Sequence, residues 1–208
     1  MKFIAGLATF AAAMAVTVPT QVLPRNNPVP HQDDPAFISA VMRAHWYWRR
    51  LHCAQDLVWD ADLASAARAD VDKCPDTATH ERPSSNLSST GPPPDDHDAW
   101  VEFARTAVHG WHDEETQYPY DNPHYDSKWG HFTQMVWRNS STVGCALGNC
   151  PSAPSFPGRI YCYYMFYGNN VAEGQFKAQV WPPVCKDPAV SEVMARSTID
   201  FDWTARAE

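Results

Sequence analysis

Apolar residues recur at steps of three and four in four parts of the chain, which is the spacing of one face of an α-helix. We expect these helices to begin near Pro35, Asp60, Asp96 and Gly130, with the third running to about Tyr118. The apolar stripes are Phe37, Ala40, Val41, Ala44, Trp48 and Leu51; Leu63, Ala67, Val71 and Cys74; Trp100, Phe103, Ala104, Ala107 and Trp111; and Phe132, Met135, Val136 and Trp137. Two aspartates directly before Pro35 are a typical helix-start signal.

Two short runs in the C-terminal half have the composition of β-strands. The runs TVGCALG, from Thr142, and RIYCYYMFYG, from Arg159, contain β-branched and aromatic residues, and each carries a cysteine. Helices followed by strands predict an α+β fold in which helices and a sheet form layers. A chain of 208 residues suits one domain, which we place at residues 35–185.

Segments without apolar periodicity predict loops and chain ends. Residues 74–96 contain many Pro, Ser and Asp residues, so we expect a long loop there. Residues 21–34 are rich in Pro and Asn and predict a mobile N-terminal arm. Residues 186–208 are polar and predict a loosely held C-terminal tail.

The N-terminus has the pattern of a secretory signal peptide. One lysine precedes an uninterrupted apolar run and an Ala-x-Ala sequence at residues 13–15, so residues 1–20 are assigned to the signal peptide. We therefore expect a secreted, extracellular protein. No later stretch has the roughly 18 consecutive apolar residues of a membrane span, so the secreted form is expected to be soluble.

Six cysteines in a secreted chain predict three disulfides, because the number is even and the compartment is oxidising. The alternative of a zinc site is disfavoured, since no Cys-x-x-Cys pair or Cys/His cluster has zinc-finger spacing. The cysteines are Cys53, Cys74, Cys145, Cys150, Cys162 and Cys185.

The charge of the chain argues against a nucleic-acid partner. The formal net charge is −8 at pH 7, and no stretch of the sequence forms a basic stripe. A phosphate backbone would be repelled by such a protein.

Two sequences fit the acceptor pattern for N-linked glycosylation, Asn86 in NLS and Asn139 in NSS. Asn86 lies in the expected long loop, whereas Asn139 ends a helix that the fold partly buries. We therefore expect Asn86 to be the better acceptor.

Two polar residues on apolar helix faces are candidates for a functional site. Glu114 continues the stripe of the third helix three residues beyond Trp111, and burying an unpaired carboxylate is costly. The alternative is that the helix has already emerged into solvent at that point. His131 occupies the first turn of the fourth helix, where a neutral imidazole faces both the core and a cleft. A lone histidine there is also compatible with a structural role.

The sequence GHFTQMVWRNS, at residues 130–140, resembles the signature of the CAP superfamily of cysteine-rich secretory, antigen 5 and pathogenesis-related 1 proteins. A second signature is partly kept, with Tyr163 and Phe166 replacing the Asn and Pro that the family has. Its matching residues are Cys162, Tyr164, Gly168 and Asn169. The resemblance covers residues 37–181, is closest to secreted fungal members, and implies an α-β-α sandwich.

The resemblance also implies a central cleft with two histidines and two glutamates. The matching positions are His80, Ser85, Glu114 and His131, so Ser85 stands where the family has a glutamate. The set His80, Glu114 and His131 suits a weakly bound divalent cation, zinc or magnesium, and no cofactor is required. Two alternatives stay open. One is a Ser85 nucleophile with a histidine base, which lacks a Gly-x-Ser-x-Gly sequence, and the other is a polar cluster that only links loop and helices.

A tyrosine-rich turn carries a second functional expectation. Tyr118, Tyr120 and Tyr125 in YPYDNPHY have a spacing that resembles the caveolin-binding-like loop with which fungal family members bind sterols. A proline-stiffened loop that displays aromatic faces offers flat apolar area to a rigid ring system at modest entropic cost. The alternative is that these tyrosines pack the turn between two helices.

The resemblance implies the disulfides Cys74–Cys150 and Cys145–Cys162, which leaves Cys53 with Cys185. Together these observations predict a secreted CAP-domain protein that binds a sterol, a fatty acid or another small lipid outside the cell. A metal-dependent hydrolase using the His/Glu cleft is one alternative, although the incomplete cleft argues against an enzyme. An extracellular recognition module with a host or cell-wall partner is the other.

Overall fold

The computed structural model describes residues 28–185. The expected signal peptide, most of the expected N-terminal arm and the C-terminal tail lie outside these residues. The elements are α1 (Pro35–Leu51), β1 (Val58–Trp59), α2 (Ala61–Val71), β2 (Ser85–Thr90), α3 (His97–Asp113), η1 (Glu114–Gln117), η2 (Ser127–Trp129), α4 (Gly130–Met135), β3 (Thr142–Asn149), β4 (Gly158–Met165) and α5 (Gln175–Gln179). None of the helices between residues 28 and 185 is long and apolar enough to cross a membrane.

The three long helices begin where an aspartate side chain accepts hydrogen bonds from the first free backbone N–H groups. The capping residues are Asp34, Asp60 and Asp96, and such caps satisfy donors that the helix itself leaves unpaired. The helix starts expected from the sequence are therefore confirmed. The third helix is shorter than expected, because it ends at Asp113 and continues as the 3₁₀ turn η1.

The four strands form one sheet in the order β1-β3-β4-β2. β1 runs parallel to β3, and the other two pairings are antiparallel. Strand β2 lies inside the segment that we expected to be a loop, so that expectation is wrong in part. Its sequence SNLSST is polar, but all six residues pair with β4, and strand pairing overrides weak intrinsic preference.

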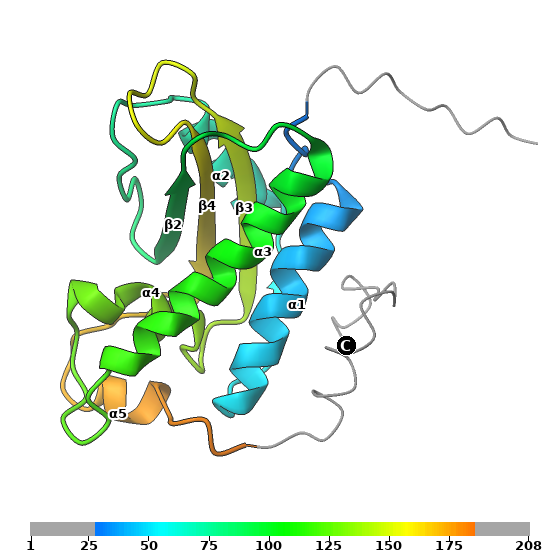
Figure 1. Cartoon of the computed structure of the whole chain (residues 1–208). Helices are drawn as coiled ribbons and strands as arrows, with labels where there is room; N and C mark the ends of the chain where they lie inside the picture. Colours follow the sequence, from blue (N-terminus) through cyan, green and yellow to red (C-terminus); the bar gives the residue numbers. More distant parts are fainter. Residues whose placement is uncertain (1–27, 186–208) are drawn as a thin grey trace, which may run out of the picture.

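The sheet lies between two helical layers, which is the expected α-β-α sandwich. Figure 1 shows α1 and α3 crossing one face of the sheet, with α2 behind it. Residues alternate along β3 and β4 between the two faces. Cys145, Leu147, Ile160, Cys162 and Tyr164 join the core beneath α1 and α3, and Ala146, Tyr161 and Tyr163 join the smaller core beneath α2.

Close packing of α2 on the sheet depends on a glycine in β3. A Cβ atom at Gly144 would lie 2.3 Å from the backbone nitrogen of Ala64 and from the backbone oxygen of Asp60. Backbone cannot give way at such distances, so only glycine allows the helix to approach this strand.

The three disulfides have the expected pairing. Cys53 joins Cys185, Cys74 joins Cys150, and Cys145 joins Cys162. Cys145 and Cys162 also stand directly opposite each other in the β3–β4 pair. The first pair ties the end of α1 to the last described residue of the chain.

A fully buried arginine joins the end of α1 to the segment that leads from α4 into β3. The Arg49 guanidinium donates to the carbonyl oxygens of Gln55, Met135, Trp137 and Ser140 at 2.8–2.9 Å. Burial lowers the pKa of Arg49 to about 10, so the group stays charged at neutral pH. Its charge is balanced by backbone dipoles at each of these four contacts.

Asn86 is not the accessible residue that the sequence suggested. It lies in β2 with 0% of its surface exposed, and its side-chain amide donates to the His131 carbonyl at 2.9 Å. Asn139 is exposed just after α4. The expected placement of Asn86 in an exposed loop is therefore wrong, because the long loop contains a paired strand.

We expect Arg49→Met to lower the free energy of unfolding by at least about 3 kcal/mol, because four buried carbonyls lose a donor at about 1–3 kcal/mol each. Urea denaturation with the disulfides intact measures this change. Arg105→Met is the matched control, since this helical arginine is exposed and pairs with Glu102. It should cost less than about 1 kcal/mol. Equal effects of the two substitutions would contradict the role assigned to Arg49.

We expect a glycan on Asn139 and none on Asn86 when the chain is secreted from a glycosylating eukaryotic host. The acceptor at 139 is exposed, whereas the acceptor at 86 is enclosed in the folded sheet. Mass spectrometry of glycopeptides measures both occupancies. Full occupancy of Asn86 would show that modification precedes folding of β2.

Candidate functional site

A cavity of about 420 Å³ lies where the start of β2 meets α4. His80 and Ser85 line it from the loop before β2 and from the first residue of β2, and His131 lines it from the first turn of α4. Tyr125 and Val171 line it from the segments before η2 and before α5. The structure therefore brings the expected cleft residues His80, Ser85 and His131 to one cavity.

Glu114 lies against His131 and is not directed into solvent. One carboxylate oxygen accepts the His131 Nδ1–H at 2.7 Å, and the other accepts the backbone N–H groups of His131 and Phe132 at 2.9 and 3.1 Å. The carboxylate thus caps the N-terminus of α4 from a distant position in the sequence, and it fixes the orientation of the imidazole. Its position at the first residue of η1 follows directly from the end of α3.

His80 is held by the serine that replaces the family's glutamate. Ser85 Oγ donates to the Arg82 carbonyl at 2.7 Å and accepts the His80 Nδ1–H at 2.8 Å. Burial, and after it the neighbouring His131, lowers the pKa of His80 below the ordinary value. The two imidazole rings are stacked, with centroids 5.4 Å apart.

These contacts limit the chemistry of Ser85. Its hydroxyl proton is given to a backbone carbonyl, and His80 acts toward it as a donor. A serine nucleophile needs the opposite arrangement, in which a histidine accepts the hydroxyl proton. The geometry therefore disfavours the alternative of a nucleophilic serine.

The expected three-ligand metal set is not assembled. Both oxygens of Glu114 are engaged by α4, and among residues 28–185 only a different group brings three donor atoms within 4.8 Å of one another. With both Nδ1 atoms donating, the Nε2 atoms of His80 and His131 keep their lone pairs, and His131 Nε2 has no partner among the described residues. A cation at this cleft would have these two nitrogens as ligands, with Glu114 and Ser85 behind them.

Of the three tyrosines expected to bind lipid, Tyr118 is buried and Tyr120 is half-buried. Tyr118 is 6% exposed and packs edge-on against Tyr120, Trp129 and Phe132. The Tyr120 hydroxyl donates to Glu115 Oε1 at 2.8 Å. Only Tyr125, which is 48% exposed, offers a free aromatic face. The alternative that the tyrosines pack the turn holds for the first two.

A group of exposed apolar residues beside the cavity was not predicted from the sequence. Phe166 and Tyr167 are exposed in the segment that follows β4, directly before the cavity residues Gly168 and Asn169. Val171 is exposed and lines the cavity itself. The signal was present, because the aromatic run MFYG continues beyond the residues that pair in β4. We refer to Tyr125, Phe166, Tyr167 and Val171 as the apolar rim.

The sequence model described as the cysteine-rich secretory protein family, CAP, matches residues 42–166. The chain belongs to the CAP family. The match runs from within α1 to just beyond the end of β4, and it includes His80, Ser85, Glu114 and His131 but not Val171.

Curated relatives include fungal and human CAP proteins. The chain is 33% identical to Protein PRY2 of Saccharomyces cerevisiae over 149 residues, which is 70% of this chain and 41% of PRY2. It is 30% identical to Secreted protein PRY1 of Candida albicans over 145 residues, 68% of this chain and 32% of PRY1. The human Golgi-associated plant pathogenesis-related protein 1 is 28% identical over 151 residues, 71% of this chain and 94% of the relative. The chain thus spans well under half of the two yeast proteins.

Solved structures support the fold. Na-ASP-1 matches with a TM-score of 0.57 and 18% identity, over 85% of this chain and 49% of that chain. BmVAL-1 matches with a TM-score of 0.54 and 17% identity, over 71% of this chain and 82% of that chain. At such identities the similarity concerns the CAP fold alone.

We expect Glu114→Ala to lower the free energy of unfolding by about 1–3 kcal/mol, because α4 loses its cap and two backbone donors lose their acceptor. Urea denaturation measures the loss, and NMR of the imidazole nitrogens should show that His131 no longer holds its proton at Nδ1. Glu173→Ala, at an exposed glutamate in the same domain, should stay within about 0.5 kcal/mol. Unchanged stability together with an unchanged tautomer would contradict the capping role.

Proposed function

We propose that this CAP protein acts outside the cell by binding a small amphipathic lipid, most favourably a sterol, at the cavity and its apolar rim. The observation that carries the proposal is the apolar rim itself. Tyr125 and Val171 are exposed and line the cavity, and Phe166 and Tyr167 are exposed in the adjoining segment. Exposed apolar side chains that line a cavity, with further ones directly beside it in the chain, are typical of a binding surface.

The polar wall of the cavity favours a ligand with one hydroxyl group. His131 Nε2 is an acceptor and Gln134 Nε2 is a donor, and both are buried without a partner among the described residues. They stand three positions apart on α4, so they share one face of that helix. A hydroxyl both donates and accepts, so it complements this pair, while an ionised carboxylate offers no proton to His131. This favours a sterol over a fatty acid.

Two further observations support extracellular lipid binding. The N-terminal sequence has the pattern of a signal peptide, and the Candida albicans relative is named a secreted protein. The resemblance to fungal members implied sterol binding through a tyrosine-rich turn, and the structure leaves Tyr125 of that turn as the exposed aromatic. Tyr125 also packs along Gly130, where an added Cβ would lie 3.4 Å from the ring. The aromatic face thus stands next to the start of α4.

The hydrolase alternative is less well supported by the geometry. Its metal would have only two imidazole ligands in the cleft, whereas catalytic zinc sites have three protein ligands. Ser85 is not activated by a base. A recognition module remains the second candidate, since the same apolar rim is compatible with a protein surface.

We expect Tyr125→Ala to weaken sterol binding at least about fivefold, since losing one aromatic contact costs about 1 kcal/mol. Fluorescence titration with dehydroergosterol, a sterol with a free 3-hydroxyl, measures the affinity. Phe156→Ala is the matched control, because Phe156 is 56% exposed but lies before the other end of β4. That strand spans roughly 23 Å at 3.3 Å per residue. The control variant should bind as the parent does.

The head-group argument is tested with the same protein and a competing ligand. A 3-keto sterol lacks the hydroxyl proton, so it should compete less well than its 3-hydroxy counterpart. The proposal is wrong if the parent binds no sterol, or if Tyr125→Ala binds as tightly as the parent. Equal competition by both sterols would show that His131 and Gln134 do not bind the 3-hydroxyl group. The assignment of the apolar rim to the binding site would still stand.

A further inference from the structure

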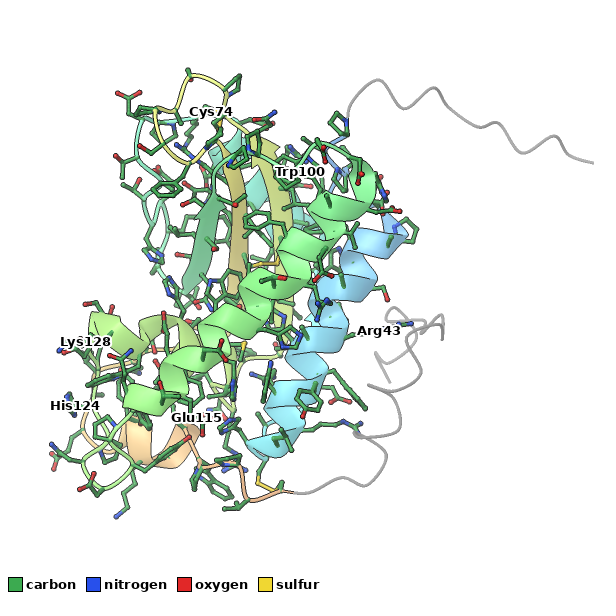
Figure 2. The ribbon with its side chains drawn as sticks, viewed as in Figure 1. Arg43, Cys74, Trp100, Glu115, His124 and Lys128 are labelled. Atoms are coloured by element: carbon green, nitrogen blue, oxygen red, sulfur yellow. A yellow bond between two sulfur atoms is a disulfide. The ribbon has the colours of Figure 1, made fainter. Side chains whose placement is uncertain are left out.

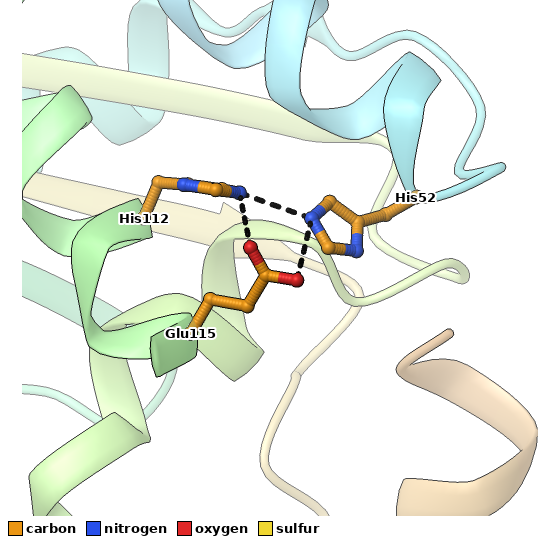
Figure 3. A group of neighbouring side chains, drawn as sticks. All are labelled: His52, His112 and Glu115. Atoms are coloured by element: carbon orange, nitrogen blue, oxygen red, sulfur yellow. Dashed lines mark hydrogen bonds and ion pairs between the residues drawn. The ribbon is translucent and has the colours of Figure 1, made fainter. Parts of the chain in front are cut away.

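A second cluster of histidines and a glutamate lies outside the cleft, where α1 and α3 end. His52 directly follows α1 and His112 lies in the last turn of α3 (Figure 3). Glu115 is in η1 (Figure 2, Figure 3). His52 Nε2 lies 3.0 Å from His112 Nε2, and His112 Nε2 lies 3.3 Å from Glu115 Oε2. His52 Nε2 lies 3.9 Å from Glu115 Oε1. Ligand atoms of three side chains from three separate segments therefore lie within 4.8 Å of one another.

The spacing of these atoms matches a tetrahedral metal site. Zinc binds imidazole nitrogen and carboxylate oxygen at about 2.0–2.2 Å, so neighbouring ligand atoms in a tetrahedron are about 3.3–3.5 Å apart. The distances of 3.0 Å between the two Nε2 atoms and 3.3 Å between His112 Nε2 and Glu115 Oε2 are close to this value. The two contacts of Glu115 are made by different oxygens, so a small rotation of the carboxylate would bring one oxygen to both imidazoles. Two imidazoles and one carboxylate are also the protein ligands of some catalytic zinc sites.

The surroundings hold each ligand in a suitable orientation. His52 Nδ1–H donates to the Trp181 carbonyl at 2.6 Å, which leaves the lone pair on Nε2 directed into the cluster. Metal-binding histidines commonly have such a carbonyl behind the ring. The ring of His112 is stacked on Trp48 with a centroid distance of 3.5 Å and an interplanar angle of 11°. Tyr120 donates its hydroxyl to Glu115 and so fixes the carboxylate.

The two histidines are buried and the glutamate is partly exposed, as expected for a metal site with one coordination position open to water. The His52 side chain is fully buried and that of His112 nearly so, while the Glu115 side chain is 20% exposed. An ion would reach the cluster on the side of Glu115, and water would complete its coordination there. In the ion-free protein, His112 donates one proton to His52, and a metal would replace that shared proton.

This cluster is separate from the cleft. Adjacent residues of a 3₁₀ turn point about 120° apart, and Glu114 caps α4 while Glu115 turns to the two histidines. The ring of Phe132, the residue after His131 in α4, packs against the cluster, 5.2 Å from the His52 ring and 5.6 Å from the His112 ring.

We propose that His52, His112 and Glu115 bind one zinc ion, with water as the fourth ligand. The ion would link the ends of α1 and α3 to η1 and, through Trp181, to the C-terminal segment that carries Cys185. An ion that binds only the folded chain also stabilises it. The ion would therefore stabilise the part of the domain next to the Cys53–Cys185 disulfide, while its water position stays open.

The test is zinc binding by the full secreted chain after treatment with a chelator, measured by competition with a chromophoric chelator. We expect one tight site in the parent and a rise in its melting temperature with zinc. Glu115→Gln keeps the shape and the acceptor for Tyr120, and His112→Phe keeps the ring on Trp48. Loss of an outer-shell partner already costs 10- to 100-fold, so losing a ligand should weaken binding at least about 100-fold. Cobalt(II) in the parent should show the intense visible bands of tetrahedral coordination.

Two histidine variants serve as controls. His109→Phe lies on the same helix and also contacts Trp48, and His80→Ala removes an imidazole from the cleft. Both should keep the tight site. The proposal is overturned if the folded parent binds no zinc, if Glu115→Gln and His112→Phe bind as the parent does, or if the tight site disappears in His80→Ala. The last outcome would assign the ion to the cleft.

Discussion

The buried charge of Arg49 is the interaction on which the arrangement of the two sites depends. Its guanidinium donates to the Gln55 carbonyl, in the segment that follows α1. It also donates to three carbonyls between the end of α4 and the start of β3, so it joins these two parts of the chain. His52 lies one turn beyond Arg49, and Gln134 directly precedes the bonded carbonyl of Met135. Because carbonyls, and not a carboxylate, accept these bonds, the contact fixes backbone positions rather than another side chain.

The sequence predicted the parts of the fold that depend on neighbours in the chain. The starts of the long helices follow from aspartate caps and apolar periodicity, which are local properties. Strand β2 could not be recognised in the same way, because its six polar residues are ordered by pairing with β4, some 70 residues further along. The error over Asn86 has the same cause, since its burial comes from a contact with α4.

The candidate sites were predictable to different degrees. The family signature located His80, Ser85, Glu114 and His131, but the role of Glu114 as a cap depends on which atoms its oxygens reach. The burial of Tyr118 depends on rings from two other segments. The cluster of His52 and His112 joins helix ends 60 residues apart, and no spacing in the sequence indicates that contact.

The adjacent glutamates of η1 restrict how this part of the chain can vary in length. Each carboxylate serves a different neighbour only because one residue of a 3₁₀ turn rotates the side chain by about 120°. A substitution at either position leaves the direction of the other unchanged. A single inserted or deleted residue before Glu114 would instead turn both carboxylates away from their partners at once. Variation between α3 and Tyr118 should therefore take the form of replacements, and alignments of working homologues should run through η1 without gaps.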